Sequence, residues 1–99
     1  MITAIVLVTT AVDAVPEVAE ALAGLEGVSE VYSVAGDVDL IVIVRVPRHD
    51  DLAEVITGRL SKTPGVRATS THVAFRAYSR HDLERAFSLG FDEGQGDPD

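Results

Sequence analysis

Apolar and polar positions along the chain predict four strands and two helices within the first 78 residues. Residues 2–10 are β-branched and almost wholly apolar, which is typical of a strand buried on both faces. Further strands are predicted over 28–35, 38–46 and 66–78, each bounded by Gly, Pro or Asp. Two apolar sets recur at helical spacing, the first being Val15, Val18, Ala19, Leu22 and Leu25 and the second Leu52, Val55, Ile56 and Leu60.

Capping and turn residues set the expected ends of these elements. Asp13 is predicted to cap the first helix, and Asp50 or Asp51 to cap the second. Gly36-Asp37 is expected to form a two-residue hairpin of type II′, because glycine favours the first central position of that turn. Each helix is followed by a Gly-Val step into a strand, so the two halves resemble each other in outline: Gly27-Val28 and Gly65-Val66.

The order strand-helix-strand-strand-helix-strand predicts a ferredoxin-like α/β (α+β) fold of the βαββαβ kind. We expect a four-stranded antiparallel sheet with two helices on one face. Residues 1–79 are predicted to form this domain, followed by a short helix over 80–90 and a disordered acidic tail over 91–99.

The predicted sheet has two apolar faces, and the helices can cover only one of them. Residues in the third strand alternate between one set, Val38, Leu40, Val42, Val44 and Val46, and another, Asp39, Ile41, Ile43 and Arg45. Monomers rarely leave so large an apolar sheet exposed to water. We therefore expect sheet-to-sheet packing in a homodimer, the alternative being that the helix over 80–90 folds back over this face.

Charge excludes some functional classes. The 99 residues include 16 acidic and 8 basic side chains, which gives a formal net charge of −8. Direct binding to nucleic acid or to an anionic membrane depends on clustered Lys and Arg, so we expect neither. The first residues lack the basic region and long apolar core of a signal peptide, and no apolar run is long enough to span a bilayer. We therefore expect a cytoplasmic location.

Catalytic and metal-binding signatures are not found in the sequence. Cysteine is absent, and no Gly-x-Ser-x-Gly elbow or glycine-rich phosphate loop occurs. The three histidines, His49, His72 and His81, have no partners at metal-ligand spacing. We therefore predict a protein that is not an enzyme and that needs no cofactor.

Carboxylates and hydroxyls are expected to gather at one end of the sheet. In the strand order 4-1-3-2, Asp37 and Asp39 lie about two strand spacings, or ~10 Å, from Thr69 and Thr71. Such a group can bind an ammonium ion through charge-assisted hydrogen bonds. The alternative is an ordinary polar rim, because Asp favours turns and Thr favours strands.

Several motifs in this order resemble the effector domain of the Lrp/AsnC regulators. They are the Gly-Asp-x-Asp hairpin within residues 33–42, the Thr63-Pro64-Gly65-Val66 turn followed by Thr69-x-Thr71, and Gly27-Val28-x-x-Val31, which together cover residues 1 to about 78. The resemblance implies dimers that assemble into rings, often octamers, with an amino acid or similar effector bound between subunits. It implies that Asp37, Asp39, Thr69 and Thr71 contact the effector and that Gly36 lets the backbone approach it.

Family regulators carry an N-terminal helix-turn-helix domain, whereas this chain starts at the first strand of the effector domain. We therefore expect a stand-alone module for effector binding and oligomerisation, which assembles with itself and with full-length Lrp/AsnC regulators. Two alternatives share the fold. One is a dimeric α/β-barrel enzyme of the cofactor-independent monooxygenase or isomerase type, for which Tyr32, His72 and Tyr78 are the residues of interest. The other is an ACT-like regulatory domain.

Overall fold

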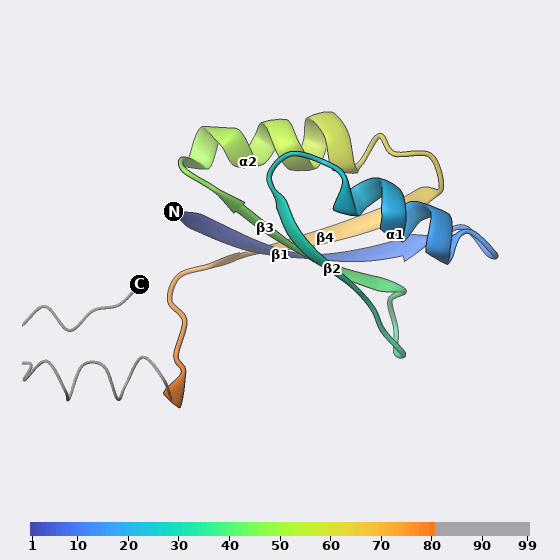
Figure 1. Ribbon diagram of the computed structural model, residues 1–99, viewed down its shortest axis with the longest axis horizontal. Helices are drawn as coiled ribbons and strands as arrows, with labels where there is room; N and C mark the ends of the chain where they lie inside the picture. The colour runs from blue at the N-terminus through green and yellow to red at the C-terminus, as the bar shows by residue number, and fades with distance from the viewer. Residues whose placement is uncertain (81–99) are drawn as a thin grey trace, which may run out of the picture.

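The protein forms a four-stranded antiparallel sheet with its helices packed on one face (Figure 1). A computed structural model describes residues 1–80. Its elements are β1 (Ile2–Thr10), α1 (Val15–Ala23), β2 (Val28–Ser33), β3 (Leu40–Val46), α2 (His49–Val55), η1 (Ile56–Leu60) and β4 (Val66–Ala74). The strand order is β2-β3-β1-β4, which confirms the predicted ferredoxin-like arrangement. No helix in this part of the chain is both long and apolar enough to cross a membrane.

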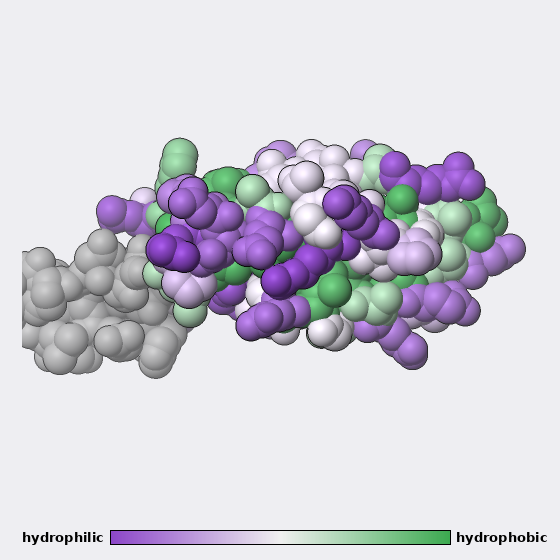
Figure 2. All heavy atoms as spheres, turned by 90° about the horizontal axis from the view of Figure 1, so that it is seen from above, coloured by the Kyte–Doolittle hydropathy of each residue, from purple (hydrophilic) through white to green (hydrophobic). Residues whose placement is uncertain are grey.

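The core lies between the helices and one face of the two central strands. Alternate residues of β1 and β3 are buried there, namely Ala4, Val6, Val8, Leu40, Val42, Val44 and Val46. The helices contribute the apolar stripes predicted from sequence, with Val18 and Leu22 from α1 and Leu52 and Val55 from α2. Seen from the helix side, the surface is largely hydrophilic or neutral, with smaller apolar areas between the polar side chains (Figure 2).

The face of the sheet away from the helices is called the open face below. Its centre consists of four aliphatic side chains on β1 and β3, each partly exposed: Ile5, Leu7, Ile41 and Ile43. Beyond Ala74 the chain runs away from the sheet on this same side (Figure 1). The predicted second apolar face therefore exists. The helix and tail predicted over 80–90 and 91–99 lie, from residue 81 onward, outside the described residues.

The helix starts differ from the capping predictions. The residue before α1 is Ala14 rather than Asp13, which instead has a positive φ of 71° in the preceding turn. Neither Asp50 nor Asp51 precedes α2, because Arg48 occupies that position. Asp51 still contributes from the first turn, where its Oδ2 accepts a hydrogen bond of 3.3 Å from the Arg48 N–H. An aspartate can therefore stabilise a helix start from inside the helix as well as from the cap.

Three strands are shorter than predicted at the ends that face solvent. β2 ends at Ser33, β3 begins at Leu40 and β4 ends at Ala74. Propensity continues into the flanking residues, but the strand pairing itself stops at Ser33 with Leu40 and at Ala74 with Thr3. The second helix continues as η1 through a wider turn, in which the Ser61 N–H donates to the Ile56 carbonyl at 2.8 Å. This wider turn leaves Leu60 fully buried.

Two glycines bring the connecting loops against the helices. Gly27, after α1, has a φ of +97°, and an added Cβ would lie 2.7 Å from Cγ2 of Val55 in α2. Gly65, before β4, has a φ of +96°, and its Cβ would lie 2.6 Å from Cγ2 of Val18 in α1. Gly27 therefore packs against α2, and Gly65 packs against α1. This close packing explains why a glycine precedes the valine at both Gly-Val steps.

Replacing either glycine with alanine is expected to lower the free energy of unfolding by about 1–3 kcal/mol, because a Cβ adds both a clash and an unfavourable φ. Gly58→Ala is the matched control, since Gly58 lies in the helical segment and a Cβ added there would meet no atom within 4 Å. This control should be neutral or stabilising by up to about 1 kcal/mol. Urea unfolding measures all three, and an equal loss in the control would contradict the packing argument.

Candidate functional site

The hairpin between β2 and β3 carries three of the five predicted site residues. Its last strand pair is Ser33 with Leu40, and the Val34 N–H then donates to the Asp39 carbonyl at 3.1 Å. Four residues, 35–38, therefore form the loop, and the prediction of a two-residue turn is wrong. Gly36 supplies a φ of +147° there, a conformation that favours glycine.

Asp39 ties this hairpin to the end of β1. Its Oδ2 accepts a 2.9 Å hydrogen bond from the Thr10 N–H and lies 3.4 Å from the Thr10 hydroxyl. Its own N–H donates to the Val8 carbonyl at 3.0 Å. Thr10 is the one buried polar residue among the described residues. Asp39 therefore has a structural task that sequence reasoning did not assign to it, and its contact with an effector stays a prediction.

Asp37, unlike Asp39, has no bonding partner within residues 1–80. It lies exposed in the loop and makes no hydrogen bond or ion pair to any residue in the range 1–80. No atom lies within 4 Å of the Cβ position of the neighbouring Gly36. The loop therefore presents one carboxylate to solvent on a backbone that the Asp39 contacts hold in place.

Thr69 and Thr71 lie on β4, across the sheet from the hairpin. Val8 pairs with both Leu40 and Thr69, so two strand spacings, about 10 Å, separate the start of β3 from Thr69. Thr69 is partly buried and Thr71 is exposed. The structure thus brings the two groups to one end of the sheet, as predicted, but no hydrogen bond joins them within residues 1–80.

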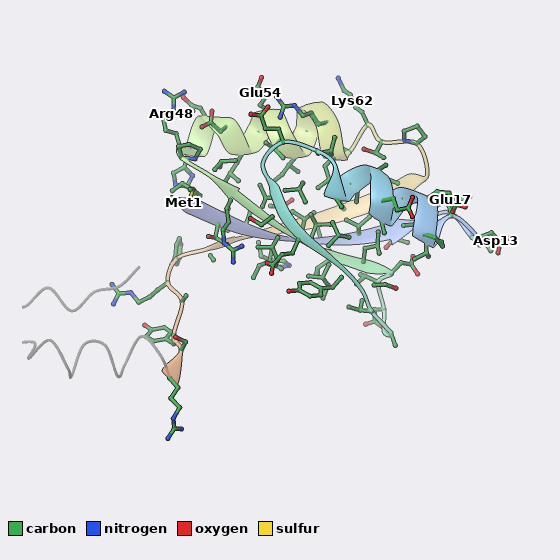
Figure 3. All side chains as sticks on the ribbon, viewed as in Figure 1. Met1, Asp13, Glu17, Arg48, Glu54 and Lys62 are labelled. Atoms are coloured by element: carbon green, nitrogen blue, oxygen red, sulfur yellow. The ribbon has the colours of Figure 1, made fainter. Side chains whose placement is uncertain are left out.

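Two cavities of the domain lie elsewhere. One of about 390 Å³ is lined by Glu26, Gly27, Arg45, Val46, Pro47, Asp51, Glu54, Val55 and Arg59. Another of about 290 Å³ is lined by Met1, Thr3, Arg45, Ala74, Phe75, Arg76 and Ala77. Neither contains a predicted site residue. Arg48, Glu54 and Lys62 point away from the sheet, above the helix layer (Figure 3).

A polar cluster on the open face was missed by sequence reasoning. Glu30 on β2 accepts a 2.9 Å hydrogen bond from the Tyr32 hydroxyl and forms a 3.3 Å ion pair with Arg45 on β3. The hydrogen bond to Glu30, together with the negative charge of that carboxylate, raises the pKa of Tyr32. The alternation of Glu30 and Tyr32 along one strand was the available signal, but the pairing with Arg45 depends on register.

The residues proposed for an enzyme do not converge. Tyr32 and His72 lie on the two outer strands of the sheet, with β3 and β1 between them. Tyr78 is exposed and lies beyond the end of β4. Within residues 1–80, no group of three His, Asp or Glu side chains is placed to hold a metal ion.

Asp39→Ala is expected to lower the free energy of unfolding by about 1–2 kcal/mol, because the Thr10 N–H then loses its acceptor. Asp37→Ala, two residues earlier, is the matched control and should change stability by less than about 0.5 kcal/mol. Chemical denaturation distinguishes them. Equal effects from both substitutions would mean that the loss of negative charge, rather than the Thr10 contact, decides stability.

Comparison with known proteins agrees with this fold. The family model of the Lrp/AsnC ligand binding domain matches residues 3–83. The crystal structure of TTHA0845 from Thermus thermophilus is 44% identical with a TM-score of 0.75, and the match covers 81% of this chain and 100% of that one. The feast or famine regulatory protein Rv3291c from M. tuberculosis, complexed with L-methionine, is 29% identical with a TM-score of 0.63, covering 81% of this chain and 54% of that one.

The curated relatives bear names of transcriptional regulators. YugG of Bacillus subtilis, an HTH-type transcriptional regulator, is 34% identical over 77 residues, which are 78% of this chain and 45% of that protein. The chain spans less than half the length of the curated relatives it matches. With the family model covering residues 3–83 and the predicted fold confirmed, the chain belongs to the Lrp/AsnC ligand binding domain family.

Proposed function

We propose that this domain binds an amino acid or a similar small metabolite between subunits and thereby modulates transcriptional regulators of its family. The observation that carries the proposal is the hairpin loop, which presents the Asp37 carboxylate to solvent on a backbone fixed by Asp39 and Thr10. An exposed carboxylate with no partner in its own protomer's residues 1–80 can accept a charge-assisted hydrogen bond from an ammonium group without first giving up another contact. Amino acids offer such a group.

Relatives support the same class of ligand. Rv3291c, at 29% identity, is complexed with L-methionine, and the matching family model is described as a ligand binding domain. The curated relatives are named regulators rather than enzymes, which agrees with a protein that is not an enzyme. Assembly with full-length regulators would couple the bound effector to DNA without a basic surface on this acidic domain.

We expect the ligand to bind between subunits because a single protomer keeps the two groups of predicted site residues apart. The loop with Asp37 and the strand with Thr69 and Thr71 are separated by the width of two strands. Thr69 and Thr71 pair with Val8 and Val6, whose side chains are buried on the helix side, so a second subunit that completes the site would approach it from the end of the sheet. The aliphatic centre of the open face gives the chain a reason to associate, since burying it removes apolar area from water. We accordingly expect dimers, and rings of dimers.

An amino acid that binds should raise the melting temperature. At a hundredfold excess over Kd the stabilisation is about 2.7 kcal/mol, which shifts a domain of this size by several degrees. Asp37→Asn should abolish the shift, whereas Asp50→Asn, which removes the same charge from an exposed helix position, should preserve it. A thermal-shift screen against the twenty amino acids tests this directly. The proposal fails if none of them shifts the wild type.

Ile43→Asp should convert an oligomer into a monomer, because each two-fold interface would then bury two unpaired carboxylates. Val12→Asp is the matched control, since Val12 is 85% exposed in the loop after β1 and away from the open face. Light scattering at tens of micromolar gives the mass of each. A monomeric wild type would show that the open face does not mediate self-association, and the site between subunits would be lost with it.

A further inference from the structure

The strand β4 enters the sheet with an irregularity. Thr9 of β1 pairs with Ala68, but the next residue, Thr10, pairs with Val66, so Arg67 has no pairing partner in β1. One extra residue on one strand of an antiparallel pair is a β-bulge, which changes the direction of a side chain and is common beside binding sites. Arg67 is the extra residue in this bulge.

The bulge decides which side chain enters the core. Regular pairing would place Arg67 opposite Thr10, on the side of β1 that the helices bury, where a guanidinium group would lose its hydration. Instead Val66 lies opposite Thr10 and packs against the core, while Arg67 is exposed. Beyond the bulge, the Ala11 N–H donates to the Gly65 carbonyl at 2.8 Å, so the backbone is held on both sides of Arg67.

Arg67 makes no hydrogen bond or ion pair within residues 1–80. Three other arginines do form ion pairs with acidic side chains, namely Arg45, Arg48 and Arg59. The basic residue that precedes Arg67 in the chain, Lys62, points away from the sheet above the helix layer (Figure 3). Arg67 therefore has all of its N–H donors available to a ligand at this end of the sheet.

Arg67 and Asp37 flank the end of β1 with opposite charges. Asp39 accepts a hydrogen bond from the Thr10 N–H on one side of β1, and the bulge lies on the other side. Asp37 lies in the loop two residues before Asp39. Two strand spacings, about 10 Å at the backbone, therefore separate two exposed side chains of opposite charge that are not bonded to each other.

We propose that Arg67 binds the carboxylate of the effector while Asp37 binds its ammonium group, which makes the site selective for α-amino acids over amines. The inference rests on the proposed function and adds a second charged residue to that site. A guanidinium group binds a carboxylate through two parallel hydrogen bonds. An α-amino acid carries its two charged groups on one carbon, so the ligand by itself is too short to fill the gap. The long arginine side chain covers most of the remaining distance.

A second role for Arg67 would need no ligand. A charged side chain on an edge strand discourages pairing with other chains, and β4 is an edge strand of this sheet. The two roles lead to different expectations, because only a ligand contact relates Arg67 to the carboxylate of the molecule that binds.

Titration calorimetry with an amino acid and its amide tests the contact. The first probes are L-methionine, with which Rv3291c is complexed, and L-methioninamide, which keeps the ammonium group but has no carboxylate. Where another of the twenty amino acids gives a larger thermal shift, that amino acid and its amide replace them. The wild type should bind the amino acid about 10–100-fold more tightly than the amide, because hydrogen bonds to charged groups contribute that much.

Arg67→Gln should weaken binding of the amino acid by the same factor and leave binding of the amide unchanged, so that the variant no longer distinguishes the two. Arg67→Lys should fall between them, since lysine keeps the charge but loses the paired donors. Lys62→Gln is the matched control, because it removes the same charge from an exposed side chain that points away from the sheet. Urea unfolding should show equal stability for Arg67→Gln and the wild type.

The outcomes separate this inference from the proposed function. Loss of amino-acid affinity in Arg67→Gln but not in Lys62→Gln, together with loss of discrimination against the amide, supports the carboxylate contact. An Arg67→Gln variant that still prefers the amino acid overturns the contact but leaves the proposed function standing. Aggregation of that variant with unchanged affinity overturns it as well and assigns Arg67 to protection of the edge strand. If no amino acid binds the wild type, both the proposed function and this contact are wrong.

Discussion

Seven alanine, valine and leucine side chains of β1 and β3 are fully or almost fully buried beneath α1 and α2, and the rest of the domain is arranged around that contact. The two central strands are aliphatic on both faces, so covering one face with helices leaves the other as an apolar surface. Gly27 and Gly65 let the connecting loops pack closely against Val55 of α2 and Val18 of α1, because a Cβ at either position would clash with those side chains. The internal packing and the open face thus have the same cause. β1 and β3 are apolar on both faces, and one layer of helices covers only one of them.

Sequence reasoning predicted most of this arrangement because it depends on periodicity. Alternation in residues 38–46 separated Val42 and Val44 from Ile41 and Ile43 correctly, and the helical stripes identified Val18, Leu22, Leu52 and Val55 as core. Element ends were predicted less well, because they depend on where a neighbour stops pairing. Asp13 has the right residue type for a cap, but the backbone places it one residue too early, with a positive φ.

The candidate site, like the fold, was predicted from sequence only in part. Topology alone brought the Gly36-Asp37 hairpin, the end of β1 and the start of β4 to one end of the sheet, as the register confirms. What periodicity could not reveal was the difference between two aspartates of one motif. Asp39 holds Thr10 while Asp37 has no partner within residues 1–80, and only the hydrogen bonds distinguish them. The Glu30, Tyr32 and Arg45 cluster was missed for the same reason, since it joins residues fifteen positions apart.

The central position of β1 has a consequence for synthesis. β1 is the first strand made, yet its two neighbours in the sheet are β3 and β4, the latter starting at Val66. At roughly 5–20 residues per second, the ribosome needs several seconds to release both partners. Even after β3 has paired along one edge of this aliphatic strand, the other edge stays unpaired until β4 has emerged.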